Sequence, residues 1–371
     1  MPEDRYAPLR EIMATAGLDA VALVPGPNFQ RLFAKSFHVN ERSLVVVVPK
    51  SGTPAAVVPS LEAASFDLIE FEGAVHLWRD HDGPGDAFIA VGRDLTRGRI
   101  GVARIGVEGQ YMRVMDQFGL QSAFPGAAFA DLQKAISNTL RLRKTGEEIA
   151  RLKRAIAISE DALTATLNEV RAGQSEVDVE GILLRNLFSC GAEGLAFEPI
   201  VAAADNSYRP HAKARRDYEI KPGDALLLDF GAIYDNYLAD ITRTVFVEHC
   251  PDGARTFYET VREANRVGRQ AARPGVTAHE VDDAVQNVLE ASPYAEFVRT
   301  KTGHGLGLDV HEDPYIMRGN HEVLEPGMVF TVEPGLYDPS GIGVRIEDDV
   351  LITGDGAETL THFDRGLRLV G

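Results

Sequence analysis

The sequence contains few cysteines and no long hydrophobic run. Cys190 and Cys250 are the only cysteines among 371 residues, and their spacing is not that of a sulfur-ligated metal site. A disulfide framework is therefore not expected, which indicates a reducing compartment. The longest aliphatic run, residues 44–48, is far shorter than the ~20 residues of a membrane span. Because the N-terminus also lacks the basic and apolar regions of a signal peptide, we expect a cytoplasmic protein with no membrane partner.

Positive charge is also scarce, because 38 Lys and Arg residues face 55 Asp and Glu residues and leave a formal net charge of −17. An acidic surface argues against a nucleic-acid partner, since such a partner offers phosphate groups. The other interpretation of the acid excess is that some carboxylates hold metal cations. The hydrophobic share of 44% and the charged share of 25% are those of an ordinary globular protein, and the length predicts about two domains.

Residues 1–137 alternate short helical and strand signals and predict an α/β domain. The first helix is expected over residues 6–17, where a glycine closes it. Strands are expected where apolar and β-branched residues gather between turn signals. The expected strands are residues 20–24, 43–49, 55–59, 75–78 and 100–108. This domain carries no obvious catalytic cluster.

A long helix-forming segment, residues 138–172, marks a change in the chain. Its apolar residues recur at helical spacing, and Gly173 follows it as a cap. We therefore place a domain boundary after residue 137, with a second domain over residues 138–371. The other helices expected in that domain are residues 177–189, 254–272 and 278–291. Its strands carry nearly all of the candidate chemistry.

Residues 224–248 predict a β-hairpin, because two β-rich runs flank a polar turn around Asp235. With the turn centred there, Asp229 and Asp240 oppose each other across the two strands. Directly opposed residues have Cβ atoms ~5 Å apart, and like charges at that distance destabilise a sheet. A cation between the two carboxylates would explain the pair.

A second hairpin is expected from strands over residues 328–336 and 343–353, joined by a turn near residue 340. The same counting places Glu333 opposite Glu347. His304 lies between the two hairpins and is flanked by glycines, which let the backbone come close to whatever the imidazole binds. Two acidic pairs in two hairpins are hard to explain without metal.

Four carboxylates and one imidazole predict a centre for two divalent cations. The negative charges of Asp229, Asp240, Glu333 and Glu347 would balance the positive charges of two such ions, as a buried site requires. With His304 as the single nitrogen ligand, the oxygen-rich set favours manganese, with cobalt or zinc as alternatives. Two metals ~3.5–4 Å apart that share a bridging hydroxide would form a hydrolytic centre.

Simpler interpretations exist for each residue alone. Asp229 and Asp240 are also compatible with edge-strand charges, Glu333 with a solvated turn, and Glu347 with an acidic surface run. The glycine-rich segment 303–307 is a weak candidate for a nucleotide loop, because it lacks the GxGxxG spacing and no obvious helix follows. Taken together, the five candidate ligands favour the metal site.

Five ordered motifs resemble those of the pita-bread metallopeptidases, in particular the Xaa-Pro dipeptidase (prolidase) and aminopeptidase P branch. They are Asp-Phe-Gly (229–231), Ala-Asp-Ile-Thr-Arg-Thr (239–244), Gly-His-Gly-Leu-Gly-Leu-Asp-Val-His-Glu (303–312), Pro-Gly-Met-Val-Phe-Thr-Val-Glu-Pro-Gly (326–335) and Gly-Val-Arg-Ile-Glu-Asp (343–348). The resemblance implies an α+β protein with a C-terminal pita-bread catalytic domain and a creatinase-like α/β N-terminal domain. It also implies a dinuclear centre, usually of manganese, and a homodimer.

The resemblance further implies roles for the ligand residues. The metal ligands would be Asp229, Asp240, His304, Glu333 and Glu347. Asp240 and Glu347 would bridge the ions. Glu333 would also be the general base, which takes a proton from the metal-bridging water and delivers it to the leaving nitrogen. Thr242 would support Asp240 or serve only strand formation.

Substrate contacts are implied by the same resemblance. His311 would contact the scissile carbonyl and stabilise the oxyanion, and His211 would lie on the far side of the substrate. Arg345 points to the same face as Glu347 by strand alternation and would anchor the substrate or an acid. Tyr237 matches an aromatic position of the family and is equally compatible with a core position.

Two departures from the family concern the free carboxylate of a dipeptide. Many bacterial prolidases carry His-Arg before the Thr-Gly-His-Gly motif, where this chain has Thr300 and Lys301. Lys301 keeps the positive charge but loses bidentate geometry. The family's Tyr-Leu-Thr-Gly-Phe loop is replaced here by residues 31–35, and His38 or Arg42 are candidate substitutes.

We therefore predict an Xaa-Pro dipeptidase that acts on proline-containing dipeptides or short peptides. The close alternative is aminopeptidase P-like removal of the N-terminal residue from longer Xaa-Pro peptides. A metal-free creatinase-like hydrolase and a non-enzymatic binding module are further alternatives. All five ligand positions are intact and basic extensions are missing, which disfavours both.

Overall fold

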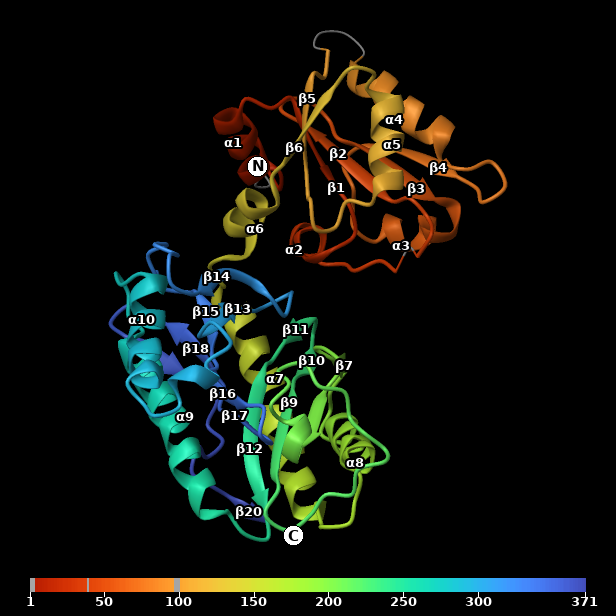
Figure 1. Ribbon diagram of the computed structural model, residues 1–371. Helices are drawn as coiled ribbons and strands as arrows, with labels where there is room; N and C mark the ends of the chain where they lie inside the picture. The colour runs from red at the N-terminus through yellow and green to blue at the C-terminus, as the bar shows by residue number, and fades with distance from the viewer. Residues whose placement is uncertain (1–3, 39, 97–100) are drawn as a thin grey trace. The chain divides into compact units, whose positions relative to one another are not determined.

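The computed structural model describes residues 4–38, 40–96 and 101–371 (Figure 1). The chain divides into two units, Met1–Arg141 and Leu142–Gly371. The sequence predicts this boundary after residue 137, whereas the structure places it at Arg141, because α6 (Gln133–Arg141) packs against α1 (Ala7–Ala16) and α2 (Pro27–Phe33) of the first unit. In the part of the chain that is described, no helix is long and apolar enough to cross a membrane. Both cysteines are free.

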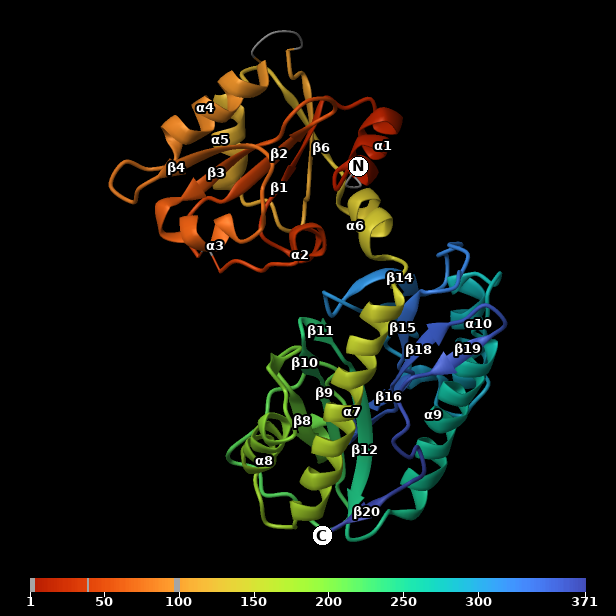
Figure 2. The same ribbon diagram turned by 180° about the vertical axis from the view of Figure 1, so that it is seen from behind.

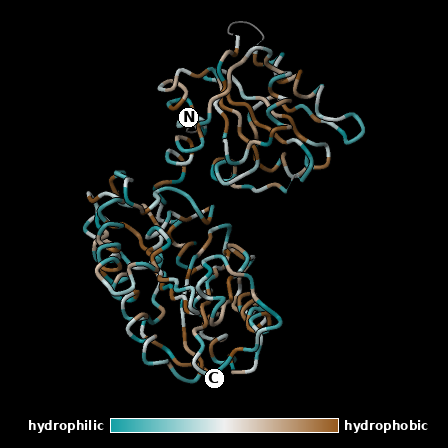
Figure 3. Tube along the Cα trace, in the orientation of Figure 1, coloured by the Kyte–Doolittle hydropathy of each residue, from teal (hydrophilic) through white to brown (hydrophobic). Residues whose placement is uncertain are grey.

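The first unit is a mixed sheet with helices on both faces, as predicted for an α/β domain. Its strand order is β4-β3-β2-β1-β5-β6, and apolar residues gather on the central strands (Figure 3). The strands are β1 (Ala20–Leu23), β2 (Val45–Pro49), β3 (Ala55–Pro59), β4 (Ala74–Trp78), β5 (Arg104–Val107) and β6 (Ala128–Asp131). The remaining helices are η1 (Ser60–Glu62), α3 (Ala63–Asp67), α4 (Gly85–Thr96) and α5 (Val114–Ala123). Alternation along β2 buries both faces, since Val46 packs in the layer of Leu9 and Val47 in the layer of Phe88.

The single long helix predicted over residues 138–172 is wrong, because two helices occupy this stretch. α6 ends at Arg141, and α7 (Gly146–Glu169) begins after a capping box. The Thr145 hydroxyl accepts the Glu148 N–H at 3.3 Å, and the Glu148 carboxylate accepts the Thr145 N–H at 2.7 Å. This reciprocal pair starts a new helix and so interrupts the helical pattern that the apolar spacing indicates.

The second unit holds its sheets between two pairs of helices (Figures 1 and 2). α7 and α8 (Glu176–Ser189) cover the sheet β20-β12-β9-β8, and α9 (Asp252–Ala271) and α10 (Ala278–Glu290) pack against the sheet β14-β13-β15-β18-β19 and the pair β16-β17. The first strands are β7 (Gly194–Leu195), β8 (Ile200–Ala203), β9 (Ala225–Phe230), β10 (Ala232–Tyr234), β11 (Tyr237–Leu238) and β12 (Ile241–Val247). The others are β13 (Gly303–Gly305), β14 (Glu312–Ile316), β15 (Val329–Val332), β16 (Gly335–Asp338), β17 (Ile342–Arg345), β18 (Asp348–Ile352), β19 (Ala357–Thr359) and β20 (Leu369–Val370). Two short 3-10 helices are η2 (Ala204–Asn206) and η3 (Ala295–Phe297).

The first hairpin forms with a different register from the one predicted. Asp229 of β9 pairs with Thr242 of β12, so its predicted direct opposition to Asp240 is wrong. The turn is centred on Asp235 and Asn236, which both have positive φ, and this shifts the pairing by two residues. Because side chains alternate with a period of two, the shift leaves both aspartates on the same face.

The second hairpin has the predicted register. Val332 pairs with Asp348, and Gly335 pairs with Arg345. Between these two ladders, Glu333 lies across from Glu347. Each predicted strand is divided in two at this acidic residue, so that both carboxylates occupy short breaks between paired segments.

Candidate active site

A cavity of about 850 Å³ opens in the second unit, and it collects nearly all of the predicted site residues. The predicted residues that line it are Asp229, Asp240, His304, Glu333, Glu347, His211, His311, Lys301 and Arg345. They come from both sheets and from the loops beside them. Two of them that are 116 positions apart in the chain, Asp229 and Arg345, form an ion pair at this site.

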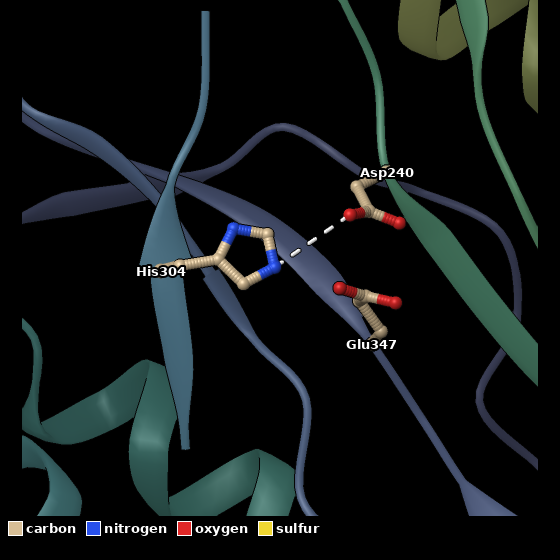
Figure 4. A group of neighbouring side chains, drawn as sticks. All are labelled: Asp240, His304 and Glu347. Atoms are coloured by element: carbon tan, nitrogen blue, oxygen red, sulfur yellow. Dashed lines mark ion pairs between the residues drawn. The ribbon is translucent and has the colours of Figure 1, made fainter. Parts of the chain in front are cut away.

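Asp240, His304 and Glu347 form the centre of this cluster (Figure 4). Each is buried, and one possible ligand atom from each lies within 4.8 Å of the others. The His304 ring points between the two carboxylates, with Nε2 3.7 Å from Asp240 Oδ2. Glu333 Oε1 lies 3.3 Å from the same nitrogen. Four of the five predicted ligands therefore converge on one point.

The tautomer of His304 suits a metal ligand. Its Nδ1 lies 3.2 Å from the carbonyl oxygen of Gly305, and a carbonyl can only accept, so Nδ1 carries the proton. Nε2 then presents a lone pair to the carboxylates, an arrangement that is repulsive until a cation lies between them. Histidine ligands of metals are oriented by such bonds from the other ring nitrogen.

The glycines beside His304 lie against the backbone of the neighbouring strands. A Cβ on Gly303 would lie 1.9 Å from the Thr331 carbonyl oxygen, and a Cβ on Gly305 would lie 2.2 Å from the Asp313 carbonyl oxygen. The glycines therefore permit close packing of β13 between its neighbouring strands, and this packing fixes the imidazole.

The carboxylates retain unsatisfied oxygens that fit divalent cations. Among the described residues, Asp229 Oδ1 and Asp240 Oδ1 are buried and have no hydrogen-bond partner. An orphaned buried carboxylate oxygen is costly. A set of four carboxylates and one imidazole is suited to oxygen-preferring divalent ions such as manganese. The residues present therefore fit the metal centre that the sequence predicts.

Burial and mutual repulsion oppose ionisation of this cluster. Burial, followed by the charge of Glu347, raises the pKa of Asp240 well above its ordinary value. Burial and the charge of Glu333 do the same to the pKa of Glu347. Burial also raises the pKa of Glu333 to about 7 and lowers the pKa of His304 well below 6.5. The buried carboxylates therefore lack the positive charge that would stabilise their ionised forms.

Thr242 supports a different carboxylate from the predicted one. Its hydroxyl donates to Glu347 Oε2 at 2.6 Å and accepts from Arg345 Nε at 3.0 Å. The predicted contact to Asp240 is therefore wrong, because the register of the hairpin carries Thr242 towards the opposite strand pair. A hydroxyl in this position holds Glu347 in one orientation.

Arg345 anchors an acid, one of the two roles predicted for it. Its Nη2 forms an ion pair with Asp229, and its Nη1 donates to the Tyr337 hydroxyl at 2.7 Å. Tyr337 was missed by the sequence reasoning, although strand alternation places it on the same face of β16 as Gly335, the register partner of Arg345. Arg345 also lines the cavity.

His311, His211 and Lys301 also line the cavity. The rings of His304 and His311 have centroids 3.9 Å apart. Burial and then the charge of Lys301 lower the pKa of His311 below 6.5. Lys301 Nζ lies 5.6 Å from the centre of the Tyr315 ring. His211 is exposed on the loop after η2.

One predicted substrate contact, Tyr237, lies outside the cavity. Tyr237 is buried, does not line the cavity, and donates its hydroxyl to Glu148 of α7 at 2.7 Å. Its place is in the packing between β11 and α7, because the hairpin turn directs it to the helix layer. His38 is an exposed residue of the first unit, and its contact with substrate stays a prediction.

Several cavity residues carried no sequence signal. The apolar part of the lining includes Phe197, Pro199 and Ile200, and the acidic part includes Glu180 and Glu198. Phe197, Pro199 and Glu198 lie in the irregular segment between β7 and β8, where neither periodicity nor a motif marks them. Only their nearness to His211 in the fold identifies them.

Similarity to known proteins agrees with this geometry. Residues 5–143 match the Creatinase/Prolidase N-terminal domain, and residues 150–354 match Metallopeptidase family M24. An Xaa-Pro dipeptidase from Lactobacillus helveticus is 33% identical over 337 residues, which cover 90% of each chain. A recombinant prolidase structure from Thermococcus sibiricus matches with a TM-score of 0.91 at 30% identity over 100% of both chains. An X-Pro aminopeptidase structure from Thermotoga maritima matches with a TM-score of 0.79 at 30% identity over 95% of this chain and 98% of the other.

These matches confirm the predicted fold class, a pita-bread catalytic domain preceded by a creatinase-like N-terminal domain. They span both units of the chain and include every candidate ligand. The family also accounts for the use of divalent metal, to which the buried cluster is suited. The chain therefore belongs to Metallopeptidase family M24 and is a metallopeptidase with a Creatinase/Prolidase N-terminal domain.

Proposed function

We propose that this metallopeptidase hydrolyses the bond before proline in Xaa-Pro dipeptides. The observation that carries the proposal is the convergence of four carboxylates and one imidazole on the wall of one cavity. The relatives and matching structures named as Xaa-Pro dipeptidase and prolidase support the substrate class. Two divalent cations, manganese first, with cobalt or zinc as alternatives, would be held by Asp229, Asp240, His304, Glu333 and Glu347.

Glu333 is the proposed general base. Bound divalent cations supply Lewis-acid activation of water and of the scissile carbonyl. Glu333 takes a proton from the attacking water and gives it to the proline nitrogen as that nitrogen leaves. Its carboxylate lies at the cavity wall beside His304, with Oε1 3.3 Å from Nε2 of that ring, where an activated water and the substrate nitrogen would be within reach.

The two cavity histidines are the proposed contacts of the scissile carbonyl. The lowered pKa of His311 keeps the imidazole neutral near pH 7, so that one ring nitrogen can donate to the carbonyl oxygen as negative charge develops on it. His211 lies on a separate loop and would hold the substrate from another side. A proline amide has no N–H, so recognition has to come from contacts of this kind.

The free carboxylate of a dipeptide fits the cationic side of the cavity. Arg299 and Lys301 both line it, and Lys301 stands over the Tyr315 ring, which limits its freedom. His38 remains a further candidate for this contact. A cationic group near the proline end favours a substrate that ends there.

Aminopeptidase P-like cleavage of longer peptides is the second candidate function. It is favoured by the similarity to the X-Pro aminopeptidase structure from Thermotoga maritima. Comparing hydrolysis of Ala-Pro and Ala-Pro-Ala by the manganese-loaded protein separates the two. We expect turnover of the dipeptide, whereas cleavage of the tripeptide alone would establish the second function in its place.

A cytoplasmic homodimer also belongs to this proposal and is supported by the family resemblance. Light scattering of the purified protein tests the subunit number, and elemental analysis of protein from native cells tests the choice of manganese. A monomer, or a different bound metal, would replace the corresponding part of the proposal.

A further inference from the structure

The loop that carries His211 into the cavity is tied at both ends to one buried carboxylate. Glu176, the first residue of α8, is fully buried. At the start of the loop it accepts the Ala203 N–H at 2.8 Å and the Asn206 side-chain amide at 2.9 Å. At the end of the loop it accepts the Arg215 N–H at 2.6 Å. Ala203 and Arg215, which are twelve positions apart, are therefore both bound by the Glu176 carboxylate.

Arg215 closes this arrangement from the other side. Its guanidinium donates to Glu176 through Nη2 at 2.9 Å and through Nε at 3.2 Å. The same side chain donates to the Ala203 carbonyl at 3.0 Å and to Asp205 at 2.8 Å. It also lies 4.3 Å from the centre of the Tyr218 ring. A planar fork bound in this way holds the two loop ends at a fixed separation.

The interior of the loop is fixed to the same anchor. The Asn206 amide that binds Glu176 also donates to the Lys213 carbonyl at 2.9 Å. The Ala212 N–H donates to the Arg209 carbonyl at 3.2 Å, which forms the turn that contains His211. The position of the imidazole therefore depends on a chain of contacts that begins at Glu176.

The start of α8 does not require Glu176. Ser175 and Asp178 already form a capping box, in which the serine hydroxyl accepts the Asp178 N–H at 3.1 Å and the aspartate accepts the Ser175 N–H at 2.9 Å. Among the described residues, the hydrogen-bond partners of the Glu176 carboxylate all belong to residues 203–215. A carboxylate that is buried and fully engaged with one loop indicates a role in that loop.

We propose that Glu176 is a positioning residue, which acts through Asn206 and Arg215 to hold His211 at the substrate. This inference rests on the proposed function, in which His211 contacts the scissile carbonyl region. It assigns to Glu176 no contact with substrate or metal. The Arg345 side of the cavity is independent of it, since Arg345 is held by Asp229, Tyr337 and Thr242.

A double-mutant cycle on the manganese-loaded full chain tests the proposal. Glu176→Gln keeps the volume and removes the charge that Arg215 binds, and we expect it to lower kcat/KM for Ala-Pro about 10- to 100-fold. In a His211→Ala background the same change should cause no further loss, because the group that it positions is already gone. Bound manganese per chain should stay unchanged in both variants.

Arg215→Lys is a second variant, for use if Glu176→Gln folds poorly. It keeps the positive charge but loses the planar guanidinium, and it should also lower kcat/KM in the wild type and cause no further loss in the His211→Ala background. Glu169→Gln is the matched control, because Glu169 forms an exposed ion pair with Arg185 in the same helix pair, and it should leave kcat/KM unchanged. Losses that multiply in the double variants, or lost manganese, would overturn the proposal.

Hydrogen exchange gives a readout that is independent of turnover. We expect Glu176→Gln to raise exchange across residues 204–214 while α9 and α10 keep their protection. Unchanged exchange in the loop would overturn the positioning role. If the wild-type protein cleaves no proline peptide, the proposed function fails, and the exchange result still decides whether Glu176 orders the loop.

Discussion

At the residue scale, the candidate active site is defined by carboxylates whose surroundings oppose their charge. Glu333 shows this most clearly, because it combines a cavity position, a contact with His304 and a pKa raised to about 7 by burial. A carboxylate in this position is a candidate for proton transfer. Burial and neighbouring carboxylates also raise the pKa of Asp240 and of Glu347, so that a bound cation would favour the ionised form of both.

Replacing Glu333 by Gln should remove most of the activity while the shape of the cavity wall stays the same. The amide keeps the shape of the side chain but cannot accept and return a proton, so we expect kcat to fall about 10²- to 10⁴-fold. Steady-state hydrolysis of Ala-Pro measures the change, and elemental analysis shows whether the metal remains. A variant that retains metal and more than a tenth of the wild-type kcat would rule out Glu333 as the base.

The buried carboxyl of Glu108 leads us to predict how the stability of the first unit depends on pH. It is fully buried, accepts the Val24 N–H at 3.2 Å and the Asn28 amide at 2.9 Å, and has its pKa raised by burial to about 7. Between its ordinary 4.5 and about 7 the unfolded chain gives up this proton first, so stability falls as the pH rises and stays lower above pH 7. Glu108→Gln removes the titrating carboxyl, and its amide nitrogen cannot accept one of these two hydrogen bonds.

Thermal unfolding at pH 5 and pH 8 should therefore show a fall in stability of the wild type that exceeds the fall in the Glu108→Gln variant by on the order of 2 kcal/mol, because the variant develops no buried charge. An equal fall in the two proteins would show that the native state accommodates the ionised carboxylate.

At the element scale, the hairpins decide which groups meet. The turn at Asp235 and Asn236 sets the register that pairs Asp229 with Thr242, and that register brings the Thr242 hydroxyl to Glu347. A sequence count that centres the turn one residue earlier loses this contact while keeping the correct face. The face of the sheet on which a side chain lies follows from the two-residue period of the strand, whereas the pairing register of a hairpin depends on the geometry of its turn.

Thr242→Val should weaken metal binding. It keeps the β-branched shape and removes the hydroxyl that donates to Glu347 and accepts from Arg345. We expect manganese affinity to fall about 10- to 100-fold, as for other groups that orient a metal ligand. Calorimetric titration measures it, with Thr164→Val, an exposed helical threonine, as the control. Equal affinities in both variants would contradict the role.

The sequence was most informative where chemistry is concentrated in short motifs. The five candidate ligands and the opposition of Glu333 and Glu347 follow from strand patterns and residue type. The break between α6 and α7 did not follow from apolar spacing, because it depends on the capping pair Thr145 and Glu148. Contacts made across the fold, such as Tyr337 on Arg345 or Glu176 on the His211 loop, leave no local pattern to detect.

At the scale of the whole molecule, part of the −17 net charge is concentrated in one buried cluster. Asp229, Asp240, Glu333 and Glu347 contribute four of these charges when they are ionised, and two divalent cations would neutralise them. Burying these carboxylate charges without a compensating cation is unfavourable, as the raised pKa values of three of the groups show. Metal binding and folding stability are therefore linked.

Removal of metal with a chelator should destabilise the protein, and more so at higher pH. For Glu333 the penalty develops as the pH rises from 4.5 towards about 7, because the folded metal-free state holds a proton that the unfolded chain has released. At a cation concentration about 100-fold above Kd, binding should add about 3 kcal/mol. Melting curves with and without manganese at pH 5 and pH 8 check this. A difference in melting temperature between the two forms that is smaller at pH 8 than at pH 5 would contradict it.

We expect one metal centre, built from these five side chains, to hydrolyse Xaa-Pro dipeptides. The rate of Ala-Pro hydrolysis, measured against manganese bound per chain and starting from chelated protein, tests this expectation. Turnover should be absent without metal, and the rate should rise to a plateau at about two ions per chain. Full activity in the chelated protein, or no turnover with both ions bound, would contradict it.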